Sequence, residues 1–280
     1  MKKQRLIYEA KTYLEAYGFE AEEAEREALL MLAHLLACKP IEVYFVPEER
    51  LRAQERPLWS LLKKRARGIP LGYVLGEVEF YGRPFRVAPG VLIPRPETEI
   101  LVEEALSLCK GGEKVLELGL GSGVISLTLA LEGPGLKVLA VELSPEALEV
   151  AKENRRRYGL ERQVRFVRGD WFSPVRPGSN FDLIVSNPPY VARKEWPDLP
   201  REVREHEPRL ALLGGEDGLF FIKKTLTYAP RYLAPSGKVL LEIGYQQAEP
   251  VARLAEELGY QFYFRQDYLG HRRVLVASLP

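Results

Sequence analysis

The sequence predicts an α/β protein: a doubly wound, mostly parallel sheet preceded by a small helical domain and a β-hairpin. Three observations support this class. Apolar residues recur at helical spacing from Leu6 to about Arg67, the period falls to two between Gly68 and Arg95, and strand-like runs alternate with helical stretches after Gly112. Such alternation is typical of parallel sheets covered by helices. We expect a helical domain over residues 1–72, a hairpin linker over 73–95 and an α/β domain over 96–280.

The helical region is expected to contain several short helices. Its pattern is clearest over residues 22–36, where acidic residues precede an apolar repeat. Glycine and prolines then divide the region, at Gly18, Pro40, Pro47 and Pro57. The charge run Lys63–Arg67 is interpreted as a solvated helix face, with a partner-binding role as the alternative.

The linker and the start of the α/β domain carry turn signals. Val78, Phe80, Phe85 and Val87 flank the segment 81–84, Tyr-Gly-Arg-Pro, which predicts a β-hairpin. The segment 93–99, Ile-Pro-Arg-Pro-Glu-Thr-Glu, is expected to open a helix, because proline suits a first helical turn and acids suit its positive end.

Seven apolar runs after Gly112 are candidate strands. Helical stretches separate most of them, and no internal repeat is evident. The candidates are Val115–Gly119, Val138–Leu143, Val164–Arg168, Phe181–Ser186, Val239–Gly244, Gln261–Arg265 and Arg273–Ala277.

Composition narrows the class of protein. The chain has 280 residues, 46% hydrophobic and 28% charged, and a formal net charge of +1. No strong overall field therefore favours nucleic acid or membrane. No run resembles a signal core or a bilayer span, so we expect a cytoplasmic protein. Cys38 and Cys109, and His34, His206 and His271, match no metal or disulfide spacing.

A glycine-rich turn follows the first strand, at Gly119-Leu120-Gly121-Ser122-Gly123. Glycines at a strand-to-helix turn let a ligand lie against backbone N–H groups. Dinucleotide sites use the spacing G-x-G-x-x-G, but Val124 stands where the third glycine would be. The turn therefore favours an uncharged or zwitterionic nucleoside cofactor over a pyrophosphate.

The next two strand ends add side chains at the same edge. Glu142 closes the second strand, where an acid can accept hydrogen bonds from ribose hydroxyls. Asp170 and Trp171 follow the third, and suit the amine and the face of an adenine ring. Ligands of open α/β sheets bind outside these carboxyl ends.

The tetrad Asn187-Pro188-Pro189-Tyr190 ends the fourth strand. Asparagine supplies a fixed carbonyl acceptor, the prolines stiffen the turn, and tyrosine adds a flat ring. These groups can hold a planar amide or amine. The alternative is that the prolines only terminate a buried strand and that Tyr190 belongs to the core.

From about Gly68 onward the sequence resembles the class I S-adenosylmethionine-dependent methyltransferases, which have a Rossmann-like sheet. Within that class it resembles the peptide chain release factor N5-glutamine methyltransferases, whose layout also includes a helical N-terminal domain. Glu117 and Leu120 depart from residues common in that family. Besides the tetrad, the segments that carry this resemblance are 76–82, 93–99, 206–212, 214–219 and 241–245.

The resemblance implies S-adenosylmethionine as cofactor, S-adenosylhomocysteine as product and a release factor with a Gly-Gly-Gln loop as protein substrate. It places Gly119–Gly123, Glu142, Trp171 and Asn187 against the cofactor, and residues 187–190 against the glutamine; Asp170 is added from its position at a strand end. We expect the protein to be a monomer that transfers the methyl group directly, without a metal. The expected catalytic residues are Asn187, Pro188 and Tyr190. The rivals are a DNA or RNA adenine-N6 methyltransferase, a catalytically silent cofactor-binding or scaffold protein and, least favoured, a nicotinamide dehydrogenase.

Overall fold

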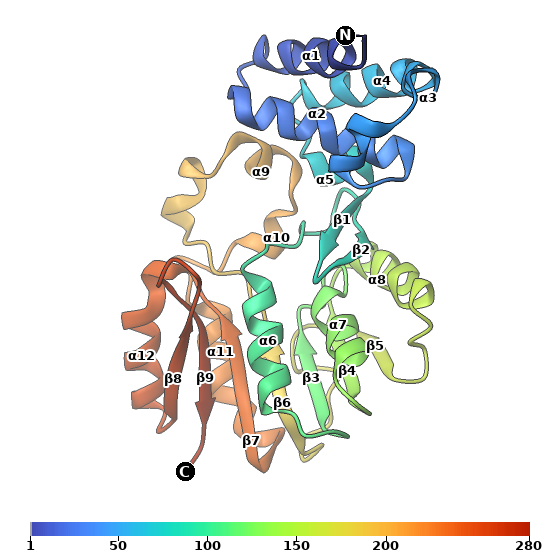
Figure 1. Cartoon of the computed structure of the whole chain (residues 1–280). Coiled ribbons are helices and arrows are strands. Elements are labelled where there is room, and N and C mark those ends of the chain that lie inside the picture. Colours follow the sequence, from blue (N-terminus) through green and yellow to red (C-terminus); the bar gives the residue numbers. More distant parts are fainter. Residues whose placement is uncertain (1) are drawn as a thin grey trace. The chain divides into compact units, whose positions relative to one another are not determined.

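The structure, a computed structural model, describes residues 2–280, with side chains from Arg5 onward. The chain forms two compact units (Figure 1). The first contains the chain up to Glu77 together with Arg201–His206, and the second contains Val78–Pro200 and Glu207–Pro280. None of the described helices has the length and apolar character that a membrane span requires.

The first unit is helical, as the sequence predicts. Its core is formed by fully buried apolar side chains such as Leu14, Met31, Leu32 and Leu58. Of the predicted breakers, Gly18 (φ 93°), Pro40 and Pro47 lie between the α-helices. Pro57 does not break a helix, because it lies in the first turn of Glu55–Arg65, where a missing N–H is tolerated. The helices are α1 (Lys2–Glu15), α2 (Ala21–Leu36), α3 (Glu48–Ala53), α4 (Glu55–Arg65), α5 (Leu71–Leu75) and α9 (Arg201–His206), with a 3₁₀ turn at Pro40–Phe45.

The charge run at the end of α4 is not one solvated face. Lys63, Lys64 and Arg67 are exposed. Arg65, in contrast, is 3% exposed; its Nε donates to Glu27 Oε2 at 2.6 Å and its Nη1 to Glu202 Oε2 at 2.6 Å. The interpretation as a solvated face is therefore wrong for Arg65, because a buried carboxylate compensates its charge.

The predicted hairpin is present as β1 (Glu77–Phe80) and β2 (Arg83–Arg86). Tyr81 and Gly82 form the turn with φ of 52° and 70°, a backbone that matches the twist of the two strands. The segment 93–99 differs from expectation. Helix α6 (Thr98–Leu108) begins only at Thr98, so Pro94 and Pro96 precede the helix and do not lie in its first turn.

All seven candidate strands are present in one sheet, in the order β5-β4-β3-β6-β7-β9-β8. The first five pair in parallel and β9 pairs antiparallel with both neighbours. The predicted fold class is therefore confirmed. The strands are β3 (Lys114–Leu118), β4 (Lys137–Glu142), β5 (Val164–Arg168), β6 (Phe181–Ser186), β7 (Leu233–Glu242), β8 (Gln261–Gln266) and β9 (Arg272–Ser278).

Helices cover both faces of this sheet (Figure 1). One face packs on α6, α7 (Val124–Glu132) and α8 (Pro145–Arg157), and the other on α11 (Phe220–Tyr228) and α12 (Ala248–Glu257). Leu116 and Leu118 of β3 point to the second face, whereas Val115 points to the first, as strand alternation requires. Shorter helical segments are α10 (Arg209–Leu212) and 3₁₀ turns at Arg193–Asp198, Ala229–Arg231 and Tyr245–Gln247.

Candidate functional site

The strand order places a switch point between β3 and β6. The chain runs from β3 outward through β4 and β5 and then returns to β6 on the other side of β3. Glu117 of β3 is paired with Val185 of β6, so the two strands end side by side. The glycine turn and Asn187 follow these two ends. In open α/β sheets this is the place where a ligand binds.

The glycine turn needs glycine for conformation and for packing. Gly119, Gly121 and Gly123 have φ of 78°, 58° and 88°, a region that other residues rarely adopt. A Cβ on Gly123 would lie 3.1 Å from Leu127 Cδ1, whereas a Cβ on Gly121 would meet nothing within 4 Å. Gly123 therefore packs against helices, and Gly121 leaves bare backbone beside open space.

A cavity of about 530 Å³ lies against this turn. Of the predicted residues, Gly119, Gly121, Glu142, Asp170, Trp171, Asn187 and Pro189 line it. Leu120 does not, because it is buried in a small cluster with Ala140 and Leu148. Ser122 is also buried, and its carbonyl accepts from Asn154 Nδ2 at 2.9 Å. Residues outside the prediction complete the lining: Gly90, Val91, Leu92, Val141, Leu143–Ala147, Arg168, Gly169, Pro208, Leu210, Ala211 and Phe221.

Glu142 is fixed at the cavity wall by backbone donors. Its Oε1 accepts from the N–H groups of Leu143 and Ser144, both at 2.8 Å, and its Oε2 accepts from Gly121 N at 2.8 Å. Each carboxylate oxygen has two lone-pair sites, so Oε1 is saturated and Oε2 has one site left. Glu142 can accept one further hydroxyl as it stands, and a second only by releasing a backbone donor.

Asp170 and Trp171 differ in burial. Asp170 is exposed, and Lys224 Nζ donates to its Oδ1 at 3.0 Å. Trp171 is buried at φ 54°, its indole Nε1 donates to Thr225 Oγ1 at 2.9 Å, and its ring centroid lies 4.8 Å from that of Phe221. The cavity therefore has an aromatic wall with a carboxylate at its exposed edge.

Asn187 is oriented by a hydrogen-bond chain whose other two members are buried. Its Nδ2 donates to Thr98 Oγ1 at 3.1 Å, and Thr98 Oγ1 donates to Glu242 Oε2 at 2.7 Å. Thr98 and Glu242 come from the first residue of α6 and the last of β7. Sequence reasoning assigned no role to either, although both lie in segments that carry the resemblance.

A second, narrow cavity of about 20 Å³ adjoins Asn187. Pro188 and Tyr190 line it together with Arg95, so it unites the tetrad residues that do not reach the larger cavity. Its volume is about that of one water molecule, so a substrate side chain must enlarge it. Burial raises the pKa of the Tyr190 phenol above its ordinary value, and the ring therefore stays neutral.

Glycines and a glutamine hold the backbone of the tetrad. A Cβ on Gly214 would lie 2.5 Å from the Pro189 carbonyl oxygen, and one on Gly218 would overlap the Tyr190 carbonyl oxygen. Gln247 Nε2 donates to the Tyr190 carbonyl at 2.9 Å. The segment 214–218 must therefore carry glycine at these contacts for the chain to pack here.

The segments 93–99 and 206–212 are joined by a buried carboxylate. Arg95 Nη2 lies 2.5 Å from Glu207 Oε1, and Ile93 N donates to Glu207 Oε2 at 3.1 Å. Leu92, which precedes the first segment, and Pro208, which belongs to the second, line the larger cavity. The Glu207 contacts therefore stabilise one wall of the site.

Glu117 lies beneath the glycine turn and is fully buried. Its Oε2 accepts from Ser126 N at 3.0 Å and from the Ser126 hydroxyl, while its Oε1 has no partner among the described residues. Burial raises the pKa of this carboxyl to about 8. Glu117 is therefore mostly protonated near neutral pH, and it neighbours the turn without lining the cavity.

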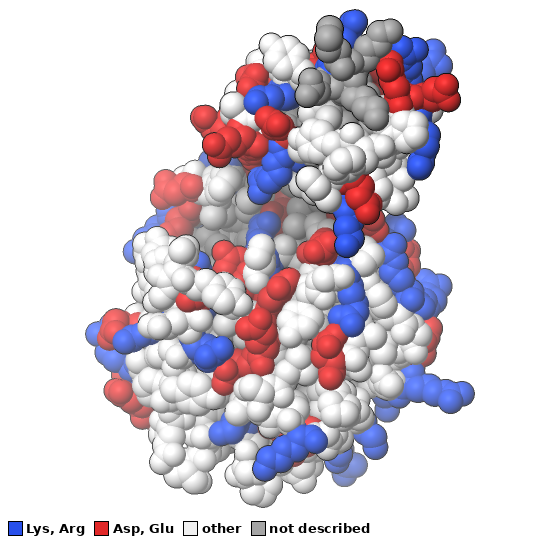
Figure 2. Space-filling model, viewed as in Figure 1, with Lys and Arg blue, Asp and Glu red and all other residues white. Residues whose placement is uncertain are grey.

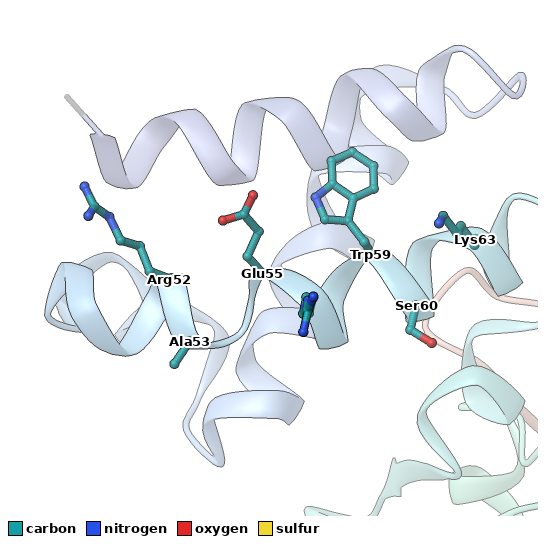
Figure 3. A pocket seen from close by; sticks show the side chains of 7 residues that line it. Arg52, Ala53, Glu55, Trp59, Ser60 and Lys63 are labelled. Atoms are coloured by element: carbon teal, nitrogen blue, oxygen red, sulfur yellow. The ribbon is translucent and has the colours of Figure 1, made fainter.

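The helical unit has a separate groove of about 700 Å³ on α3 and α4. Figure 3 shows Arg52, Glu55 and Trp59 extending toward α1. The Trp59 ring packs edge-on against Tyr13, with centroids 5.1 Å apart. Arg56 and Lys63 also line the groove, so its surface is mixed in charge.

Sequence profiles and solved structures define the class of this protein. Residues 96–205 match the Methyltransferase small domain, and residues 5–76 match the PrmC N-terminal domain. A methyltransferase from Pyrococcus furiosus superimposes with a TM-score of 0.54 and 27% identity, over 71% of this chain and 89% of that one. The fold, the glycine turn and these matches define a methyltransferase.

Curated relatives narrow that class. The release factor glutamine methyltransferase of Koribacter versatilis is 42% identical over 271 residues, which is 96% of this chain and 95% of the relative. That of Nitratidesulfovibrio vulgaris is 40% identical over 279 residues, 98% of this chain and 94% of the relative. The chain belongs to the release factor glutamine methyltransferase family, as the resemblance in its motifs predicts.

Proposed function

We propose that this enzyme transfers a methyl group from S-adenosylmethionine to the side-chain amide nitrogen of the glutamine in the Gly-Gly-Gln motif of peptide chain release factors. One observation carries the proposal. The Asn187 carboxamide lies between the two cavities beside the glycine turn, with its nitrogen engaged by Thr98. With the amide held this way round, its oxygen can accept from a ligand.

The chemistry demands such an acceptor. The lone pair of a carboxamide nitrogen is delocalised into its carbonyl, so the nitrogen is a poor nucleophile. If Asn187 Oδ1 and the Pro188 carbonyl each accept one amide hydrogen, they favour positive charge on that nitrogen and fix its direction. Tyr190, a neutral ring beside them, stacks on the amide plane. Pro188 and Pro189 keep the turn rigid.

The larger cavity fits a nucleoside cofactor. The open space beside Gly121 lets a ligand approach the backbone closely, the remaining acceptor site of Glu142 fits a ribose hydroxyl, and the aromatic wall at Trp171 fits an adenine face. Asp170 lies at the exposed edge, where it can accept from an amine. S-adenosylmethionine, when bound, supplies an electrophilic methyl group on a sulfonium and leaves as S-adenosylhomocysteine.

The helical unit is proposed to recognise the release factor. The unit has its own core and a mixed-charge groove (Figure 3), which are features of a protein-binding module. We place the functional boundaries at residues 1–72 for this domain, 73–95 for the linker and 96–280 for the methyltransferase domain. A cytoplasmic monomer fits a substrate of the translation machinery.

A nucleic-acid adenine methyltransferase is the second candidate, because the same tetrad could hold an exocyclic amine. The surface charge of this protein does not favour binding of a nucleic acid. The net charge is +1, and Figure 2 shows acidic and basic side chains interspersed over the described part of the visible face. Phosphate backbones bind through clustered cations, which this face does not present.

The test is methylation in vitro. The enzyme is incubated with methyl-labelled S-adenosylmethionine and purified release factor, or with a DNA duplex, and labelled peptides are mapped by mass spectrometry. We expect one labelled glutamine, in the Gly-Gly-Gln loop, and no label on the duplex. Label on the duplex alone, or on another residue of the release factor, would contradict the proposal.

A further inference from the structure

Three side chains from separate parts of the fold form one hydrogen-bonded chain at the site: Asn187, Thr98 and Glu242. The donor at each step is defined, from Asn187 Nδ2 to Thr98 Oγ1 and from Thr98 Oγ1 to Glu242 Oε2, at 3.1 and 2.7 Å. We propose that Thr98 and Glu242 are positioning residues that set which end of the Asn187 carboxamide faces the substrate. This inference rests on the proposed function.

The direction of the chain follows from donor count. A threonine hydroxyl has one hydrogen, and an ionised carboxylate only accepts. Once Thr98 gives its hydrogen to Glu242, its oxygen can only accept from Asn187. The amide must then present its NH₂ group to Thr98, which leaves Oδ1 for the substrate nitrogen. Without this constraint the amide could rotate and present donors to the substrate amide hydrogens, which would repel them.

Burial prevents water from replacing the chain. Thr98 and Glu242 are each 2% exposed. Ser186, which precedes Asn187, is paired with Leu241, which precedes Glu242, so the sheet register brings the two polar side chains together. A buried polar group without a partner is costly, and no solvent is available to satisfy it. The three groups therefore act as one unit.

The charge state of Glu242 controls the direction. Burial raises the pKa of this carboxyl to about 7; Glu97 also raises it, whereas Thr98, Arg273 and Arg95 lower it. Burial and the charge of Glu242 both raise the pKa of the Tyr190 phenol, which stays neutral. A protonated Glu242 can donate to Thr98, which frees the Thr98 hydrogen for Asn187 Oδ1. Turnover should therefore fall as the pH drops below about 7.

A mutant cycle tests the chain. Thr98→Val removes the hydroxyl with little change of shape, and Thr98→Ser keeps it. In the wild-type background we expect Thr98→Val to lower kcat on release factor roughly tenfold, the loss of about one hydrogen bond, and Thr98→Ser to stay within about twofold. In the Asn187→Ala background Thr98→Val should lower kcat no further, because nothing remains to orient. Calorimetry should give an unchanged Kd for S-adenosylhomocysteine.

Glu242→Gln supplies an independent readout. The substitution is isosteric, keeps a carbonyl acceptor for Thr98 and removes the titrating group, so we expect kcat to lose the acidic limb near pH 7 that the wild type shows. Equal kcat for Thr98→Val and Thr98→Ser, further loss in the Asn187→Ala background, or an unchanged acidic limb in Glu242→Gln would each overturn the inference. A wild-type enzyme that does not methylate release factor would instead overturn the proposed function.

Discussion

The orientation of the Asn187 side chain is set by its neighbours. Its oxygen can serve a substrate because its nitrogen is already bound to Thr98 at 3.1 Å. The sequence predicts a carbonyl acceptor at this strand end, but not the Thr98 and Glu242 side chains that hold the amide nitrogen away from the ligand. Thr98 is 89 positions away from Asn187, and Glu242 is 144 positions away from Thr98. No local spacing relates residues so distant in sequence.

Glu117 leads to a prediction about stability and pH. Its pKa is about 8 in the folded protein against an ordinary value of 4.5. Between these values the native state binds more protons than the unfolded chain, so the stability contribution is complete below about pH 4.5 and is lost as the pH rises through 8. Relative to Glu117→Gln, the wild type should lose on the order of a few kcal/mol of unfolding free energy between about pH 5 and 9.

Urea denaturation of both proteins across this pH range measures the difference. The comparison cancels the contribution of Glu242, which both proteins share. If the two stability curves stay parallel over the whole range, Glu117 does not titrate as a buried acid.

At the scale of elements, the glycine turn combines strain with close packing. An alanine side chain at position 123 would require an unfavourable positive φ and would place its Cβ 3.1 Å from Leu127 Cδ1 and 3.4 Å from Ala151 Cβ. We expect Gly123→Ala to cost about 2–4 kcal/mol of unfolding free energy, of which strain supplies about 1–2 and crowding the rest. The Kd for S-adenosylhomocysteine should rise as well, because the turn shifts.

Gly159→Ala is the matched control. Gly159 has φ 66° and a Cβ there would meet nothing within 4 Å, so only the strain of about 1–2 kcal/mol applies. Denaturant titration and calorimetry compare the two variants. Equal destabilisation, or unchanged ligand affinity in Gly123→Ala, would show that the packing of the turn is unimportant.

Most elements could be predicted because their signals are local. Strands buried on both faces read as apolar runs, and each of the seven candidates is a strand of the sheet. The exceptions have physical reasons. Strand β7 begins at Leu233, six residues before the predicted start. The prediction is late because Pro235 and Gly237 resemble a turn in the sequence. In the structure the strand continues past them, with a register shift against β6. Helix α6 begins at Thr98, after Pro94 and Pro96, which the sequence predicts to lie in its first turn.

The candidate site could be predicted only in part. Strand ends of a parallel sheet converge whatever the intervening sequence, so the order of strands alone predicts Gly121, Glu142 and Asn187 at the site, and all three line the cavity. The wall that contains Leu92, Pro208 and Phe221 comes from loops and a helix that no periodicity places. Such walls depend on tertiary contacts, for example those of Glu207, and these are not encoded in short-range patterns.

At the scale of the whole molecule, Arg65 holds the helical unit together across the sequence. It joins Glu27 of α2 to Glu202 of α9, a segment that lies far along the chain. Arg65→Ala should cost about 3–5 kcal/mol, because it leaves Glu27 buried and unpaired. Arg52→Ala, which breaks an exposed pair with Glu48, should cost no more than about 1 kcal/mol.

Hydrogen exchange resolves the location of these effects. Arg65→Ala should lower protection in α2, α4 and residues 201–206, while the strands of the sheet keep theirs. Glu207, whose contacts stabilise one wall of the site, directly follows His206 in the chain. Loss of order in residues 201–206 should therefore disturb that wall, and we expect the KM for release factor to rise in this variant. Protection equal to that of the Arg52→Ala control would show that the buried ion pair does not hold the helical unit together.

The central claim is that Asn187 Oδ1 holds the substrate amide during methyl transfer. The most direct measurement is the kcat of Asn187→Ala on purified release factor, with the Kd for S-adenosylhomocysteine and the thermal unfolding midpoint determined in parallel. Loss of one transition-state hydrogen bond predicts a fall in kcat on the order of a hundredfold or more, with folding intact. A kcat close to that of the wild type would contradict the account.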